Sequence, residues 1–152
     1  MQRQARSQSI STRVFIAVRK LVRRPFVLQN ALTPMRDEEH IITIEALTSA
    51  KKDLRRFVRF QFELYEGDPL WVPPLIRDEL KSLNVATNPG LEDCELRLWL
   101  AIRGSICVGR IAGVINHRDN ELRDLHAARF CLLDFVDDAE VARSLLETVE
   151  TW

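Results

Sequence analysis

The chain has 152 residues, of which 46% are hydrophobic and 29% are charged, a composition typical of one globular domain. Its formal net charge is zero, but residues 1–36 contain eight Arg or Lys residues and no acid. The remainder therefore carries 14 basic and 22 acidic residues. Such an acidic body disfavours nucleic acid as a partner, because phosphate contacts need clustered cations.

The first 36 residues differ in kind from the rest of the chain. Short apolar runs between residues 14 and 28 are interleaved with arginine and lysine. An Arg-rich, acid-free start is typical of an organellar transit peptide, and membrane contact of residues 1–34 as a basic amphipathic helix is an alternative. A third interpretation is an extension preceding a translation start at Met35. We predict a basic extension over residues 1–36 and a domain over residues 37–152.

The three cysteines, Cys94, Cys107 and Cys131, are odd in number and lie far apart. No Cys-x-x-Cys pair is present, so the pattern favours neither a disulfide framework nor a zinc site. It fits a reducing compartment, and we predict a cytoplasmic protein. No apolar run approaches the roughly 18–20 residues that span a bilayer.

The first part of the domain is predicted to contain a strand and a helix. A β-branched run at residues 41–44 favours a strand. Apolar residues between 54 and 65 recur every three or four positions, which predicts an amphipathic helix. The hydroxyl of Thr48 or Ser49 is expected to cap it.

A proline-containing loop is predicted to follow this helix. Gly67 ends the helix, and the three prolines of residues 68–74 cannot continue it. We expect an ordered loop held by packing of Trp71 on the core; an alternative is that Trp71 lines a substrate entrance. A short helix over residues 75–83 and a turn at residues 88–90 come next.

Residues 95–116 are predicted to be a β-hairpin. Leucine or isoleucine alternates with Arg, Trp or Ala over residues 96–103, the period of a strand with one buried face. The Arg-Gly-Ser sequence at residues 103–105 supplies the turn, and residues 106–115 form the returning strand.

A polar connection over residues 117–128 is expected after the hairpin. Five potential metal ligands lie in it: His117, Asp119, Glu121, Asp124 and His126. Their spacing matches no metal-binding motif, so we expect no metal site.

The last part of the chain is predicted to be a buried strand followed by a helix. The strand covers residues 130–135. The helix begins where Asp137 and Glu140 have the spacing of a capping box, and its apolar residues recur on one face. No residue typical of a helix end follows, so the helix is expected to reach the end of the chain.

This order of strand, helix, helix, hairpin, strand and helix resembles the opening of the GNAT superfamily of N-acetyltransferases. Local sequences resemble an uncharacterised bacterial branch of it over residues 41–152: YEGDPLWVPP at 65–74, Asn88-Pro89, VGRIA at 108–112 and DDAEVA at 137–142. The resemblance implies an α+β fold with a mixed, largely antiparallel sheet flanked by helices. By the same resemblance, the remaining strands and helix would follow Trp152, so we expect a partial domain.

The resemblance also implies acyl transfer from acetyl-CoA to an amine that it leaves unidentified. In that family, pantetheine binds the backbone of a splayed strand, here residues 130–135, and the CoA pyrophosphate lies at the start of the next helix. Asp134 is the acid on that strand and hence the candidate general base; the alternative is a solvated residue at a strand edge. The matching cofactor-binding positions are Phe135, Val136, Asp137, Asp138, Ala139, Glu140 and Val141.

One feature departs from the pattern of the family. The family's phosphate loop has spaced glycines, whereas residues 136–141 contain no glycine and three carboxylates, which would repel a pyrophosphate. The first hypothesis is therefore a GNAT-like N-acyltransferase domain that is inactive as this chain alone. The second is a non-catalytic GNAT-like module that binds or regulates a partner, and the third is a membrane-surface protein acting through its leader.

The missing elements also predict self-association. The strand at residues 130–135 would have one unpaired edge, and the final helix would expose apolar residues. Both features favour association between copies.

Overall fold

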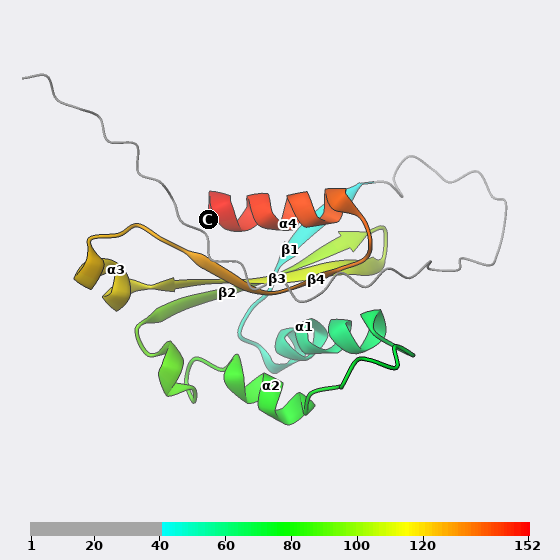
Figure 1. Ribbon diagram of the computed structural model, residues 1–152, viewed down its shortest axis with the longest axis horizontal. Helices are drawn as coiled ribbons and strands as arrows, with labels where there is room; N and C mark the ends of the chain where they lie inside the picture. Colours follow the sequence, from blue (N-terminus) through cyan, green and yellow to red (C-terminus); the bar gives the residue numbers. More distant parts are fainter. Residues whose placement is uncertain (1–40) are drawn as a thin grey trace, which may run out of the picture.

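The computed structural model describes residues 41–152, and the predicted basic extension lies outside them (Figure 1). The elements in chain order are β1 (Ile42–Ala46), α1 (Lys51–Leu64), α2 (Ile76–Ser82), the short 3₁₀ helix η2 (Pro89–Leu91), β2 (Cys94–Arg103), β3 (Ile106–Asn116), α3 (His117–Arg123), β4 (Arg129–Phe135) and α4 (Ala139–Thr151).

The four strands form one antiparallel sheet in the order β1-β2-β3-β4. The central hairpin is confirmed: β2 and β3 pair from Cys94 opposite Asn116 to Arg103 opposite Ile106, and Gly104 has a positive φ of 60° in the turn. Among the described residues β4 pairs only with β3, so its outer edge has no strand partner there. The α+β prediction is confirmed, and the order of elements is that expected from the GNAT resemblance.

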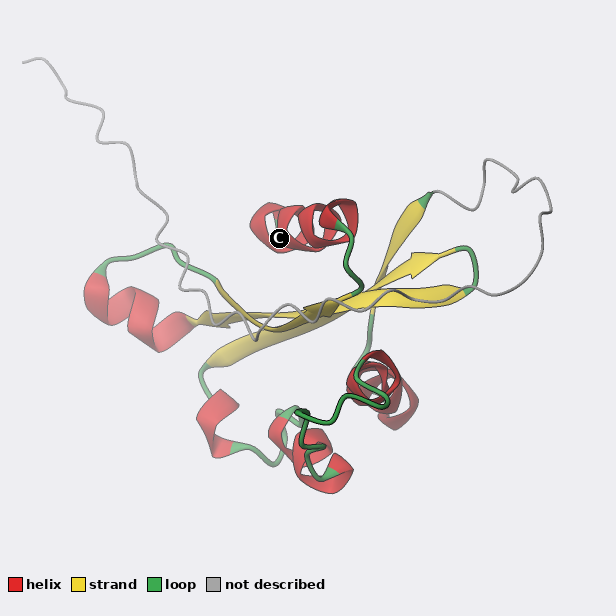
Figure 2. Cartoon of the chain, turned by 45° about the vertical axis from the view of Figure 1, so that its right-hand side comes forward, coloured by secondary structure: helices red, strands yellow, loops and turns green. Residues whose placement is uncertain are grey.

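Helices cover both faces of the sheet. In Figures 1 and 2, α4 lies on one side while α1 and α2 lie on the other. The prediction that residues 96–103 have one buried face is therefore wrong. Leu98 and Leu100 are buried against α1, and Trp99 and Ala101 are buried in the apolar core that includes α4.

Two glycines in β3 let α4 approach the sheet closely. A Cβ at Gly109 would lie 2.8 Å from both Leu145 Cδ1 and Val141 Cγ1, and a Cβ at Gly113 would lie 2.7 Å from Trp152 Cζ3. The α4 side chains Val141, Leu145 and Val149 are buried as a result. The prediction of exposed large apolar residues on the final helix is wrong, because the exposed ones in residues 41–152 lie elsewhere.

The start of α1 differs from the prediction. Ala50 is the N-cap residue and makes no side-chain capping bond, so neither Thr48 nor Ser49 caps the helix. Instead the Thr48 hydroxyl and backbone N–H both donate to Asp53 Oδ2, at 2.6 and 3.0 Å. The first-turn carboxylate reaches back along the chain and replaces the expected cap.

Residues 117–123 form the helix α3, where the sequence predicted only a polar connection. Asn116 accepts a 2.7 Å hydrogen bond from the Asp119 N–H and begins α3, which Asp124 ends with a left-handed φ of 51°. Polar residues at these two ends are an ordinary N-cap and C-cap, a signal masked by the polar character of the whole stretch. Across residues 41–152, every helix is too short or too polar to cross a bilayer.

Candidate functional site

A buried ion pair joins β3 to β4 beneath α1. Arg110 and Asp134 face each other in register and are 1% and 6% exposed. Arg110 Nη2 lies 2.6 Å from Asp134 Oδ2, and Arg110 Nε donates to the same oxygen at 2.8 Å. Arg110 Nη1 also donates to the Phe57 carbonyl at 2.9 Å, and the guanidinium lies 4.9 Å from the Phe57 ring centre.

Tyr65 completes this polar cluster from the end of α1. Its hydroxyl donates to Asp134 Oδ1 at 2.8 Å, so both carboxylate oxygens of Asp134 have a partner. The interpretation of Asp134 as a solvated strand-edge residue is therefore wrong. Its assignment as general base stays a prediction, and these contacts disfavour it because a base needs an available lone pair near the substrate.

Arg110 and Tyr65 were not singled out from the sequence, although a signal for one of them exists. Arg110 is the one charge within the apolar strand sequence ICVGRIAGVI, and Asp134 is likewise alone in FCLLDF. Buried charges in proteins are almost always paired, so two isolated opposite charges on adjacent strands predict an ion pair. Tyr65 carries no such signal, because its partner is 69 positions away.

The strand β4 contains a bulge beside this cluster. Arg110 pairs with Asp134 and Ala112 with Cys131, so two residues of β4, Leu132 and Leu133, lie opposite Ile111 alone. Leu132 has a φ of 51°, in the left-handed region that residues other than Gly, Asn and Asp rarely adopt. Strain of this kind costs about 1–3 kcal/mol and gathers at functional sites.

The start of α4 is capped by Asp138, and the predicted cap at Asp137 is wrong. Asp138 Oδ1 accepts from the Glu140 N–H at 2.8 Å, and Oδ2 forms an ion pair with Arg103. The hydrogen bond from Arg103 is the main reason that the pKa of Asp138 is lowered. A carboxylate therefore already occupies part of the amide site at which the family's pyrophosphate is expected.

The other predicted cofactor-binding positions divide into covered and exposed ones. Val141 is fully buried against the sheet, and Phe135 and Val136 are half-buried; the Val136 N–H donates to the Val108 carbonyl at 2.9 Å. The exposed positions at this helix start are Asp137, Ala139 and Glu140. The structure thus brings Asp134 and this stretch to one end of β4.

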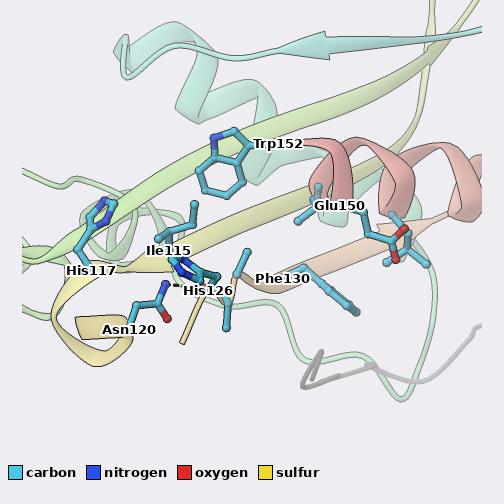
Figure 3. Close-up of a pocket in the computed structure, with 11 residues that line it drawn as sticks. Ile115, His117, Asn120, His126, Phe130, Glu150 and Trp152 are labelled. Carbon is cyan, nitrogen blue, oxygen red and sulfur yellow. Dashed lines mark hydrogen bonds between the residues drawn. The ribbon is translucent and has the colours of Figure 1, made fainter. Parts of the chain in front are cut away.

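A cavity of about 350 Å³ lies near the other end of β4, between α3 and the last turns of α4 (Figure 3). Its apolar lining includes Ile115, Phe130, Leu146, Val149 and Trp152, and its polar lining is His117, Asn120, His126 and Glu150. Asn120 Nδ2 donates to the Ala127 carbonyl at 3.0 Å, which closes the α3 side. No residue predicted from the sequence to bind cofactor lines it.

Two of the three thiols and one of the possible metal ligands have surroundings that explain shifts in their pKa values. Burial raises the pKa of Cys107 to about 11 and also raises the pKa of Cys131. Asp119, one of the potential metal ligands, instead pairs with Arg123 and Arg129, and the hydrogen bond from Arg129 lowers its pKa. No group of three His, Cys, Asp or Glu residues in this part of the chain is placed to hold a metal ion.

The chain is similar to two curated bacterial proteins. It is 33% identical to protein YghO of Escherichia coli over 102 residues, 67% of this chain and 26% of that protein. It is 31% identical to a bacterial ceramide synthase of Caulobacter vibrioides over 101 residues, 66% of this chain and 26% of that protein. The chain thus spans about a quarter of the length of these relatives. No family model and no solved structure matches it, so the GNAT resemblance rests on its motifs and element order.

Proposed function

We propose that this chain forms part of an N-acyltransferase site, in which an amine attacks the thioester of an acyl-CoA bound beside β4. The name of the Caulobacter relative supports the reaction class, because a ceramide is the amide of a fatty acid and a long-chain amino alcohol. Acetyl-CoA is the acyl donor that the GNAT resemblance proposes. The name of the relative extends that proposal to longer acyl chains and a lipid-like amine.

The bulge at Leu132 and Leu133 is the observation that carries this proposal. It interrupts pairing in a strand that has no strand partner on its other side among residues 41–152. Peptide groups at such a place can bond to an extended ligand, as a sheet edge does when it accepts a further strand. The two amide groups of pantetheine are suited to such bonding.

The proposed reaction is direct transfer. The amine nitrogen bonds to the thioester carbonyl carbon, the carbon–sulfur bond breaks, CoA leaves as a thiolate, and the amine's surplus proton neutralises that thiolate or passes to solvent. A relay through Cys107 or Cys131 is disfavoured, because thiolates are the nucleophilic form and burial raises the pKa of both thiols.

The role proposed for Asp134 follows from its partners. Arg110 and Tyr65 engage both of its oxygens, so in this proposal the carboxylate holds the bulged end of β4 in position. The peptide groups of β4 and the surface at Asp137, Ala139 and Glu140 then face the cofactor.

Calorimetric titration of the full chain with acetyl-CoA and octanoyl-CoA tests the proposal. We expect saturable binding, and we expect Asp137→Asn/Glu140→Gln to tighten it several-fold. Each removed carboxylate relieves up to about 1 kcal/mol of repulsion at roughly 4 Å in water. Glu147→Gln is the matched control, because Glu147 is an exposed acid farther along the same helix. The proposal would be contradicted if neither the wild-type chain nor the double variant bound either acyl-CoA.

The second candidate, a non-catalytic binding or regulatory module, is favoured by one observation. Asp138 caps α4 with its own carboxylate, and Asp137 and Glu140 add two further exposed acids. A chain that binds neither acyl-CoA would fit this module.

A further inference from the structure

The loop between α1 and α2 exposes a run of large apolar side chains. In this proline loop, defined as residues 68–75, Leu70, Val72 and Leu75 are 86%, 84% and 67% exposed. Ile76 at the start of α2 is exposed as well. Contiguous exposed apolar groups mark an interaction surface, whereas scattered ones are ordinary.

The proline loop is anchored on its inner side. The Trp71 ring stacks on Tyr65 with centroids 5.5 Å apart and meets the edge of Phe62 at 5.2 Å, which confirms the predicted packing of Trp71. Tyr65 in turn donates to Asp134 on β4. The exposed side chains are therefore held on a fixed backbone next to the bulged strand.

The backbone of the proline loop has few N–H groups, and those of Val72 and Leu75 have no hydrogen-bond partner among residues 41–152. Pro69, Pro73 and Pro74 have no N–H group, and the Leu70 and Trp71 N–H groups donate within the loop to the Asp68 side chain and carbonyl, at 2.9 and 3.2 Å. Unsatisfied amides are costly in lipid but are easily met by a protein partner. The two unpaired N–H groups need water or lipid oxygens as acceptors, which the headgroup region of a bilayer supplies and its hydrocarbon interior does not.

The exposed charges of α1 and α2 are basic in excess, although the exposed acids Glu63 and Glu66 lie closest to the proline loop on its α1 side in the chain. The exposed cations of the α1–α2 layer are Lys51, Lys52, Arg55, Arg59, Arg77 and Lys81. The exposed acids of residues 51–82 are Glu63, Glu66 and Asp78. This excess of cations lies on the layer that Figure 2 shows on the side of the sheet opposite α4. Basic residues close to a membrane surface are attracted to anionic lipid headgroups.

We propose that the proline loop inserts Leu70, Val72 and Leu75 into the headgroup region of an anionic bilayer, with the cations of α1 and α2 against the lipid phosphates. This inference rests on the proposed function, which gives the membrane contact its purpose: a lipid-like amine substrate would be taken from the membrane. It places that membrane beside Tyr65 and the end of β4.

Vesicle flotation tests this inference on the full chain, using phosphatidylcholine vesicles with about 30% phosphatidylglycerol. We expect Leu70→Ser/Val72→Ser to lower the partition coefficient by about tenfold, because binding scales with buried apolar area. Leu122→Ser is the matched control: Leu122 is 77% exposed on α3, so its loss should leave binding unchanged. Residues 1–36 are identical in all three proteins, so their charge cancels from the comparison.

A second variant tests the charge contribution. Arg55→Glu/Arg59→Glu should weaken binding several-fold on the anionic vesicles and have little effect on pure phosphatidylcholine. Equal partitioning of the wild type and the loop variant would overturn the proposal, as would an equal loss in Leu122→Ser. Vesicle binding is measured without acyl-CoA, so a chain that binds vesicles but no acyl-CoA keeps this inference while the enzyme proposal fails.

Discussion

Gly109 and Arg110 are neighbours in β3, yet they face opposite sides of the sheet and meet opposite kinds of surroundings. Gly109 lies under α4, where Leu145 and Val141 leave no room for a Cβ. Arg110 lies under α1, where it pairs with Asp134 and the Phe57 carbonyl. The α4 face is held mainly by apolar contact, with the ion pair between Arg103 and Asp138 at the start of α4, and the α1 face contains a buried polar cluster.

The contrast indicates a division of tasks between the two faces. The α4 face stabilises the sheet by burying apolar area, and its geometry is set by the close steric fit at Gly109 and Gly113. Hydrogen bonds and hydrogen-bonded ion pairs are directional, so the α1 face fixes the bulged end of β4 against α1. The strand end proposed to bind cofactor is thus positioned by the polar face.

The largest expected effect is on the polar face. Arg110→Met should lower the free energy of unfolding by about 3–5 kcal/mol, because it leaves the Asp134 carboxylate buried without its cation. Arg110→Met/Asp134→Leu should recover most of that loss, since well-packed apolar residues often replace a buried pair at no cost. Urea denaturation measures both. Arg118→Met, at an exposed arginine, is the control and should change stability by less than about 0.5 kcal/mol. A double variant as unstable as the single one would contradict this account.

A smaller effect is expected on the apolar face. Gly109→Ala should cost about 1–3 kcal/mol through overpacking against α4. Val141→Ala added to it should cost less than the sum of the two single changes, because it removes one of the clashing methyl groups. Gly104→Ala is the control: its Cβ would meet nothing within 4 Å, so it should suffer only the strain of its positive φ and combine additively with Val141→Ala. Additive costs at Gly109 would rule out the contact with α4 as the cause.

The smallest expected effect concerns the pH dependence of the ion pair between Arg103 of β2 and Asp138 at the start of α4. The pKa of Asp138 is lowered in the folded protein, so its contribution is present above the unfolded pKa near 4 and is lost as the pH falls through the lower folded value. Between about pH 5 and pH 2.5, Asp138→Asn should lose about 0.5–1 kcal/mol less stability than the wild type, because Asn still caps the helix. Asp137→Asn removes the same charge without the Arg103 contact and should follow the wild type. Identical pH profiles for all three would show that the ion pair with Arg103 adds nothing.

The sequence predicted the order of elements because hydrophobic periodicity and turn residues are local signals. The hairpin turn at Gly104 and the helix end near Gly67 are examples. It did not predict coverage of both sheet faces, since the alternation in residues 96–103 only separates two sets of side chains and both sets are apolar enough to be buried. The α3 helix was missed because its caps are polar residues in a polar stretch.

The candidate site was predicted only in part. Asp134 and residues 135–141 lie together at one strand end, as their adjacency in the chain requires. The contacts of Tyr65 and Arg103 depend on tertiary structure and leave no local trace. The bulge at Leu132 could not be predicted either, because the left-handed position is occupied by leucine, whereas a glycine there would have indicated a bulge.

The bulge in β4 also determines which side chains of the strand face α4 and which face α1. Phe130 and Leu133 both face the α4 core although three positions separate them, and Cys131 and Asp134 both face α1. In a regular strand the period of two would turn one member of each pair to the opposite side. One inserted residue thus directs the Asp134 carboxylate toward Arg110 instead of into the apolar core beneath α4. A change in strand length here would therefore move side chains from one face of the sheet to the other.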